Sequence, residues 1–214
     1  MKKILKEYFT GALTVPNLLS FLRIIMVPVF AVLFVKGYYG YSVLVLALSG
    51  LSDFFDGKIA RRFNQVSALG KMLDPIADKL TQITLAIVLY WTFSQAKDSL
   101  IKAFSWIFLV FLIKEAVMIV GGAAMIAMGI KPSAAEMPGK VATFAFYLIM
   151  IAIIVFGPEI GMLKNVFTLP PVVMIVLISI SALLTVFAFC SYMPGVYRQV
   201  KGRNNGESEE ADEG

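Results

Sequence analysis

Four aspartates stand close together in the sequence and are the residues best suited to chemistry: Asp53, Asp56, Asp74 and Asp78. The first pair is spaced i, i+3 and the second i, i+4, so on helices each pair projects from one face. Carboxylates without His or Cys suit hard cations such as Mg²⁺ or Mn²⁺, and two pairs suit a two-metal site. The spacing therefore predicts two converging helices and a metal-dependent transfer at phosphorus.

The positions beside the aspartates carry small side chains. Gly57 and Ala60 follow Asp53 at i+4 and i+7, and Gly70 lies one turn before the second aspartate pair. Small residues let a ligand approach the backbone closely, and Arg61 supplies a cation that can pair with phosphate. Simple pairing of the aspartates with nearby Lys and Arg side chains in a loop would explain each aspartate singly. It would not explain small residues at fixed offsets.

The composition is that of an integral membrane protein. Hydrophobic residues make up 59% of the 214 residues and charged residues 15%, whereas soluble domains average about 45–50% apolar and about 25% charged. The chain contains no histidine, so acid–base chemistry must fall to carboxylates, Lys, Tyr or water. Its single cysteine, Cys190, cannot form an intramolecular disulfide. We expect membrane lipids as partners and no nucleic acid.

Apolar runs of membrane-spanning length predict an all-α integral membrane fold with six transmembrane helices. The predicted helices cover residues 17–36, 42–63, 74–94, 103–128, 140–157 and 170–193. They form one membrane domain, residues 14–196. Residues 1–13 are predicted to form a short amphipathic helix at the membrane interface, and the polar, acidic segment 197–214 is predicted to be a disordered cytoplasmic tail.

The distribution of positive charge predicts the orientation. An even number of spans puts both termini on one side, and most Lys and Arg residues fall on that side, which predicts that it is cytoplasmic. The other side carries only Lys36, Lys97, Lys102 and Lys164. The aspartates are therefore predicted to lie at the cytoplasmic face of a multi-pass protein, and the compact chain fits a bacterial inner membrane.

The spacing of the aspartates resembles the signature of the CDP-alcohol phosphotransferase family. The resemblance covers eight fixed positions: Asp53, Asp56, Gly57, Ala60, Arg61, Gly70, Asp74 and Asp78. The family's six-helix membrane fold and cytoplasmic-side active site agree with the pattern of hydropathy and charge. The resemblance also implies a homodimer.

The same resemblance implies a role for each position. The four aspartates would hold two divalent cations, Mg²⁺ or Mn²⁺, and Asp78 would also be the general base. The donor, CDP-diacylglycerol, would be bound by Asn17, Gly57, Ala60, Arg61, Ser67 and Gly70. An alcohol deprotonated by Asp78 would attack the lipid-bearing phosphate, and CMP would leave.

Two further segments resemble the phosphatidylglycerophosphate synthases and cardiolipin synthases of this family. They are TVPNLLSFLRI, from Thr14 to Ile24, and DPIADK, from Asp74 to Lys79. Arg23 lies inside an apolar helix, where it must snorkel to the interface, form a structural ion pair or bind phosphate.

Two lysines are candidates for binding the acceptor's phosphate. Lys114 precedes Glu115 where an Arg-Glu pair is usual in phosphatidylglycerophosphate synthases, and Lys140 lies in a GK-x-x-T motif. Lysine cannot grip phosphate bidentately as arginine can, so Lys114 departs from the pattern. A second basic residue is expected a turn or two after Lys114, but Gly121-Gly122 stands there. This pair is predicted to serve close helix packing instead.

These features favour transfer to a polyol phosphate, glycerol 3-phosphate, which gives phosphatidylglycerophosphate. The alternative is cardiolipin synthesis with phosphatidylglycerol as acceptor. A divalent-cation transporter or channel would instead distribute its carboxylates along a pore. A catalytically silent scaffold is disfavoured by the complete signature, which includes Asp78.

Overall fold

The fold is known from a computed structural model that describes residues 14–62, 68–129 and 137–212. The described helices are α2 (Val15–Val35), α3 (Tyr39–Arg62), α4 (Ala68–Ser94), α5 (Ser99–Phe104), η1 (Ser105–Ile107), α6 (Phe108–Ala127), α7 (Met137–Phe156) and α8 (Pro171–Asp212). No strand occurs in these three ranges, so the all-α prediction is confirmed. The predicted interfacial helix, residues 1–13, lies outside them.

The long helices coincide with the six predicted segments, but not all of them are long and apolar enough, in the part described, to span a membrane. Among the described residues, four stretches qualify by length and apolar composition: Asn17–Val35, Ser99–Ala127, Met137–Phe156 and Pro171–Tyr197. In α3 the described apolar part, Tyr39–Ser52, is shorter than a span. α4 falls short because Asp74, Asp78 and Lys79 interrupt its apolar sequence. Large apolar side chains are exposed on the outer faces, as in an integral membrane protein.

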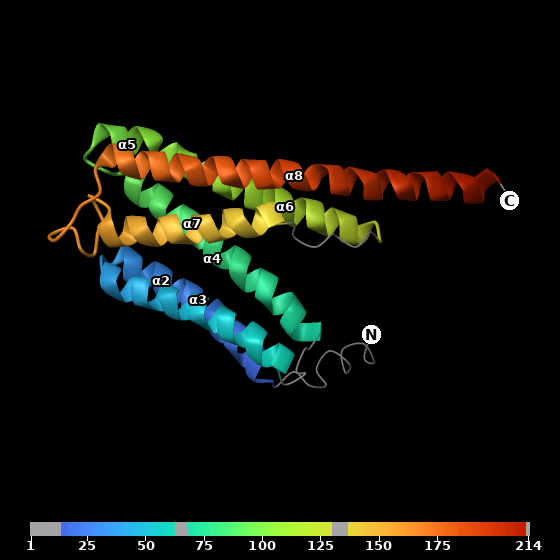
Figure 1. Cartoon of the computed structure of the whole chain (residues 1–214), viewed down its shortest axis with the longest axis horizontal. Coiled ribbons are helices and arrows are strands. Elements are labelled where there is room, and N and C mark those ends of the chain that lie inside the picture. Colours follow the sequence, from blue (N-terminus) through green and yellow to red (C-terminus); the bar gives the residue numbers. More distant parts are fainter. Residues whose placement is uncertain (1–13, 63–67, 130–136, 213–214) are drawn as a thin grey trace.

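Figure 1 shows how these helices are arranged. α2 and α3 lie side by side, and α4 crosses between this pair and the group formed by α6, α7 and α8. One end of the bundle carries the first turns of α2, α4 and α7 and the last turns of α3 and α6. We call this the aspartate end, because both aspartate pairs lie near it in the sequence of α3 and α4.

Local signals determine where several helices begin and end. Thr14 caps α2, since its hydroxyl oxygen accepts a hydrogen bond from the backbone N–H of Asn17 at 3.4 Å. Gly37, with φ of 79°, reverses the chain between α2 and α3, and Gly129, with φ of 73°, follows α6. Asp98 caps α5 at the end of the bundle opposite the aspartate end. These caps fix the lengths of the helices that carry the polar residues.

Aromatic contacts connect the apolar core to the site. Phe93 on α4 packs against Phe108, which contacts Phe111 on α6, with ring centroids 5.6 and 6.3 Å apart. Phe111 packs on Phe146 of α7 at 4.9 Å, and Phe146 packs on Tyr147 at 5.7 Å. This series of rings joins the last turns of α4 to α6 and α7, and it ends at Tyr147.

The last helix is longer than the predicted span 170–193. α8 continues to Asp212 and so includes residues 197–212 of the predicted tail. This part directly continues the apolar helix that precedes it, although Gly202, Asn204, Asn205 and Gly206 are poor helix formers. Figure 1 shows this extension reaching beyond the other helices, with no neighbouring helix beside it.

Candidate active site

α4 carries the second aspartate pair at the aspartate end. Asp74 and Asp78 lie one turn apart on this helix, as the i, i+4 spacing predicted, and both are half-buried. Ala77 is fully buried, so the adjacent face of α4 packs against its neighbours and fixes the helix. The carboxylate of Asp74 accepts a hydrogen bond of 2.5 Å from the hydroxyl of Ser20 on α2.

α2 presents a buried polar face toward these helices. Asn17, Ser20 and Arg23 follow one another at i, i+3 and i+6 and are 4%, 1% and 2% exposed. Arg23 is therefore buried and does not snorkel to the interface. Ser20 is not among the site residues predicted from the sequence, although the polar i, i+3, i+6 spacing within an apolar helix is a signal that points to it.

The first aspartate pair lies on α3. Asp53 and Asp56 belong to its second half, and α3 ends at Arg62, at the end of the bundle where α4 begins. The backbone of α3 thus puts the pair on a helix, as predicted, and also includes Gly57, Ala60 and Arg61. The side chains of these five residues, and all of Ser67, lie outside the part of the chain that the structure describes. Gly70 is buried in the first turn of α4. Convergence of all four carboxylates stays a prediction.

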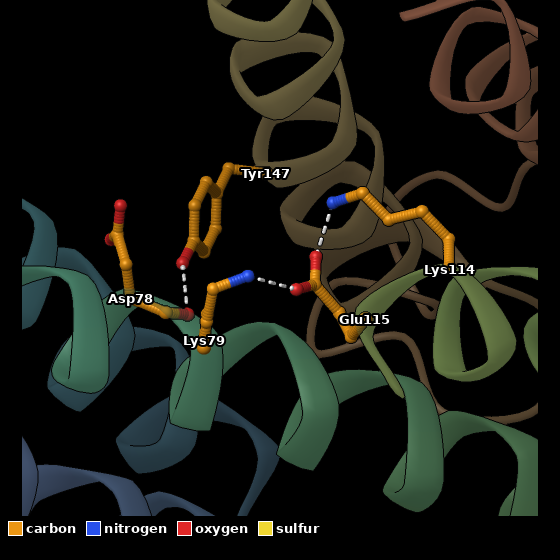
Figure 2. A network of polar contacts seen from close by, with 5 residues as sticks. All are labelled: Asp78, Lys79, Lys114, Glu115 and Tyr147. Atoms are coloured by element: carbon orange, nitrogen blue, oxygen red, sulfur yellow. Dashed lines mark hydrogen bonds and ion pairs between the residues drawn. The ribbon is translucent and has the colours of Figure 1, made fainter. Parts of the chain in front are cut away.

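A buried carboxylate joins α4 to α6 beside Asp78. Figure 2 shows Glu115 between two lysines. Lys79 on α4 donates a hydrogen bond of 2.9 Å to one carboxylate oxygen, and Lys114 donates to the other. Glu115 is 3% exposed, whereas Lys79 and Lys114 are 33% and 22% exposed. A buried carboxylate is stable only when it is paired, and here two cations compensate it, so the group carries a net positive charge.

α7 contributes a contact to the same turn of α4. The hydroxyl of Tyr147 donates a hydrogen bond of 3.4 Å to the backbone carbonyl oxygen of Asp78. In Figure 2 the carboxylate of Asp78 points away from the Glu115 group, while the ammonium of Lys79 points toward it. Neighbouring residues on a helix point in different directions, so Asp78 and Lys79 face different surroundings although they are adjacent in sequence.

A cavity of about 790 Å³ opens beside this turn. Its described lining comes from α4, α6, α7 and α8, and Asp78, Lys79, Lys114 and Glu115 form its charged wall. The remaining lining is mostly apolar and includes side chains such as Phe111, Met118, Met125, Phe146, Phe189 and Val196. The volume is in the range of small-molecule binding sites, about 300–1,000 Å³.

The cavity bears on two predictions made from the sequence, the role of Gly121-Gly122 and the grouping of Lys114 with Lys140. Gly121 and Gly122 line it, and a Cβ added at either would meet nothing within 4 Å, so the prediction that they serve close helix packing is wrong. They leave room in the cavity instead. Lys140 lies exposed in the first turn of α7 and is not among the lining residues, whereas Lys114 is. The structure thus separates the two lysines that the sequence analysis grouped together.

The comparison with known families fits this geometry. Residues 13–187 match the model of the CDP-alcohol phosphatidyltransferase family. The chain belongs to this family. The resemblance deduced from the eight signature positions is therefore confirmed, and phospholipid biosynthesis is the process in which its named relatives act.

Curated members of the CDP-alcohol phosphatidyltransferase family are similar to parts of the chain. A cardiolipin synthase (CMP-forming) of Streptomyces coelicolor is 39% identical over 150 residues, which are 65% of this chain and 66% of that protein. A putative cardiolipin synthase of Mycobacterium tuberculosis is 35% identical over 63% of this chain and 61% of its own length. A CDP-diacylglycerol--glycerol-3-phosphate 3-phosphatidyltransferase of Blochmanniella floridana is 40% identical over 38% of this chain and 44% of its own length. The matches thus span less than two thirds of these relatives.

Proposed function

We propose that this protein transfers a phosphatidyl group from CDP-diacylglycerol to an alcohol and releases CMP. The observation that carries the proposal is the position of Asp78 on α4. It lies one turn from Asp74 and is one of the residues that line the cavity, so one aspartate of the signature borders a space where an acceptor can bind. Membership in the CDP-alcohol phosphatidyltransferase family supports the same reaction class.

The proposal includes two divalent cations, Mg²⁺ or Mn²⁺, held by the four aspartates. The donors are all oxygens, which hard cations prefer. Ser20 uses one lone-pair position on Asp74, and because a carboxylate has about four such positions, Asp74 can still bind a cation. When bound, the cations neutralise the diphosphate of the donor and the charge that develops on the leaving CMP.

Asp78 is the general base in this mechanism. Its carboxylate takes the proton from the acceptor hydroxyl as the alcohol oxygen attacks the phosphorus of the phosphatidyl group. A bond forms between that oxygen and phosphorus, the bond from phosphorus to the CMP oxygen breaks, and Asp78 passes its proton to water. Tyr147 donates a hydrogen bond to the backbone carbonyl oxygen of Asp78, which holds this turn of α4 against α7.

The acceptor has two candidates. The sequence favours glycerol 3-phosphate. Two observations support phosphatidylglycerol as a second candidate: the mostly apolar lining of the cavity, and the longer matches to relatives named cardiolipin synthases. A lipid acceptor needs an apolar path into the bundle, whereas a free phosphate ester needs only a basic pocket.

The proposal also includes the membrane topology. α3 and α4 complete the six spans, since their charged segments lie at the aspartate end, where head groups and water meet. Both termini and the active site then face the cytoplasm of a bacterial inner membrane. A homodimer is part of this proposal, in keeping with the family resemblance.

Transfer of the phosphatidyl group is tested by offering acceptors separately to the purified protein. With CDP-diacylglycerol and Mg²⁺, we expect CMP release with glycerol 3-phosphate or with phosphatidylglycerol, and none with serine. The phosphatidyl product should be identified by mass spectrometry in the same samples. Release with serine alone would contradict the proposed acceptors, because it would require a different acceptor pocket.

Replacement of Ser20 should weaken metal binding without removing the base. In Ser20→Ala the 2.5 Å hydrogen bond that orients Asp74 is lost, and loss of such a supporting contact typically lowers metal affinity about 10-fold. We expect the Mg²⁺ concentration for half-maximal CMP release to rise by this factor, with the rate at saturating Mg²⁺ largely retained. Ser20→Thr keeps the hydroxyl and is the matched control. An unchanged Mg²⁺ requirement in Ser20→Ala would remove Ser20 from the site.

A further inference from the structure

The segment between α7 and α8, residues 157–170, forms an ordered loop, which we call the α7–α8 loop. The main-chain N–H groups of Met162, Leu163 and Leu169 donate hydrogen bonds of 2.8–3.0 Å to carbonyl oxygens in the last turn of α7. The last carbonyls of a helix have no partner within the helix, so the loop supplies the donors that they need. Its two ends lie close together, as in a compact Ω-loop.

Further contacts hold the α7–α8 loop against the bundle. Ile160 is 1% exposed and belongs to the apolar core. One carboxylate oxygen of Glu159 accepts hydrogen bonds from the backbone N–H groups of Lys97 at 3.1 Å and Asp98 at 3.5 Å, between α4 and α5. A Cβ on Gly161 would lie 2.4 Å from a backbone oxygen of the same loop, so this close turn requires glycine. The loop therefore has a fixed position on the bundle.

The α7–α8 loop nevertheless exposes large apolar side chains. Met162, Leu163, Val166 and Phe167 are 51%, 37%, 83% and 55% exposed, and we call these four residues the apolar tip. Figure 1 shows the loop, drawn in orange, projecting from the end of the bundle opposite the aspartate end. Apolar surface that is concentrated in one place and left exposed marks a site of contact with another protein or with a membrane.

The same end of the bundle carries exposed aromatic side chains. Tyr38 and Tyr41 lie at the start of α3 and are 54% and 66% exposed, and Trp106 of η1 is 63% exposed. Trp91, near the end of α4, is 62% exposed. Tyr and Trp are enriched where acyl chains meet head groups, since each has an apolar ring and one polar group. These rings indicate that the membrane interface lies at this end of the helices.

Positive charge is in excess around the α7–α8 loop. The exposed charged side chains described at this end are all lysines: Lys36, Lys97, Lys102 and Lys164. The two acidic residues described there, Asp98 and Glu159, are half-buried and accept backbone hydrogen bonds. Lys164 lies within the loop, among the residues of the apolar tip. Lysines next to an apolar surface attract acidic lipid head groups.

We propose that the α7–α8 loop inserts its apolar tip into the membrane leaflet opposite the aspartate end, and that Lys164 binds acidic phospholipid head groups there. A lipid surface fits better than a protein partner, because the exposed apolar faces of the helices continue to the loop and because aromatic rings and lysines surround it. The loop has a fixed shape, so its insertion determines how deeply this end of the bundle lies in the membrane.

The position of the apolar tip is measured on the full-length protein in lipid nanodiscs. A fluorophore is attached to Val166→Cys in a Cys190→Ser protein, which has no other cysteine. We expect nitroxide-labelled lipid to quench this label and aqueous iodide to leave it largely unquenched. Leu183→Cys, at a position of α8 that is 69% exposed, is the reference for a label in lipid. Melting temperatures in detergent check that the labelled proteins are folded.

The role of Lys164 is measured by changing the charge of the membrane. The nanodiscs contain phosphatidylcholine alone or with phosphatidylserine, an acidic lipid that is neither of the proposed acceptors. We expect Lys164→Gln to lower the ratio of lipid-quenched to iodide-quenched label about fivefold in acidic nanodiscs, the contribution of one lysine at an anionic surface, and to leave it unchanged in phosphatidylcholine alone. Lys201→Gln is the matched control, because Lys201 is exposed on the extension of α8 beyond the aspartate end.

Three results would overturn the inference. Strong quenching by iodide alone would mean that the apolar tip lies in water. Protection from both quenchers would mean that a second copy of the chain or another protein covers it. An unchanged ratio in Lys164→Gln on acidic nanodiscs would exclude head-group binding by this lysine. None of these readouts requires CMP release, so the inference stands or falls separately from the proposed function.

Discussion

Asp78→Asn is expected to lower kcat by about 10²–10⁴, the usual contribution of a general base, and to leave the KM for CDP-diacylglycerol within a few-fold. Asparagine has nearly the shape of aspartate but cannot take a proton from the acceptor hydroxyl. The main-chain bond from Tyr147 does not depend on the carboxylate, so the turn of α4 should keep its place. Steady-state CMP release at saturating donor and acceptor measures the effect.

A matched control exists at the other end of the bundle. Asp98→Asn makes the same chemical change at the N-cap of α5, where Asn serves almost as well as Asp. We expect its kcat to equal that of the unmodified protein. If Asp78→Asn kept more than about a tenth of the activity, well above what loss of a base leaves, Asp78 would not be the base.

Removal of divalent cations is expected to abolish turnover altogether. In the proposed site the four carboxylates lie close together and repel one another, and bound cations compensate this repulsion. EDTA should therefore stop CMP release, and excess Mg²⁺ or Mn²⁺ should restore it. EDTA saturated with Mg²⁺ beforehand is the control for effects of the chelator itself.

The melting temperature gives a second readout of the same site. We expect Mg²⁺ to raise it in the unmodified protein, because a ligand that binds only the folded state stabilises that state. The rise should be smaller in Asp74→Asn, which lacks one of the proposed ligands. Full activity in EDTA would contradict a metal-dependent mechanism, whatever the melting temperatures.

The features that the sequence predicted well depend on local periodicity. The i, i+3 and i, i+4 spacings of the aspartates place each pair on one helix, and α3 and α4 are helical through these positions. The predicted segment 42–63 differs from α3, Tyr39–Arg62, by a few residues at its start, because the turn at Gly37 lets α3 begin earlier. Apolar runs and turn glycines act within a few residues, so the sequence reveals them directly.

The contacts that build the cavity wall could not be predicted in this way. Lys79 and Glu115 are on different helices, as are Ser20 and Asp74, and their pairing depends on how α2, α4 and α6 pack. Gly121 and Gly122 illustrate the same limit. Paired small residues in a membrane helix suggest close packing, but only the position of the neighbouring helices shows that these two face a cavity.

The central claim, phosphatidyl transfer from CDP-diacylglycerol, is tested most directly by measuring CMP and the phosphatidyl product together. The purified protein is given CDP-diacylglycerol and Mg²⁺, with and without an acceptor that carries a glycerol phosphate. We predict CMP and a new phosphatidyl lipid in equal amounts, and only when the acceptor is present. CMP release at the same rate without any acceptor, with phosphatidic acid as the lipid product, would mean hydrolysis of the donor and would contradict the account.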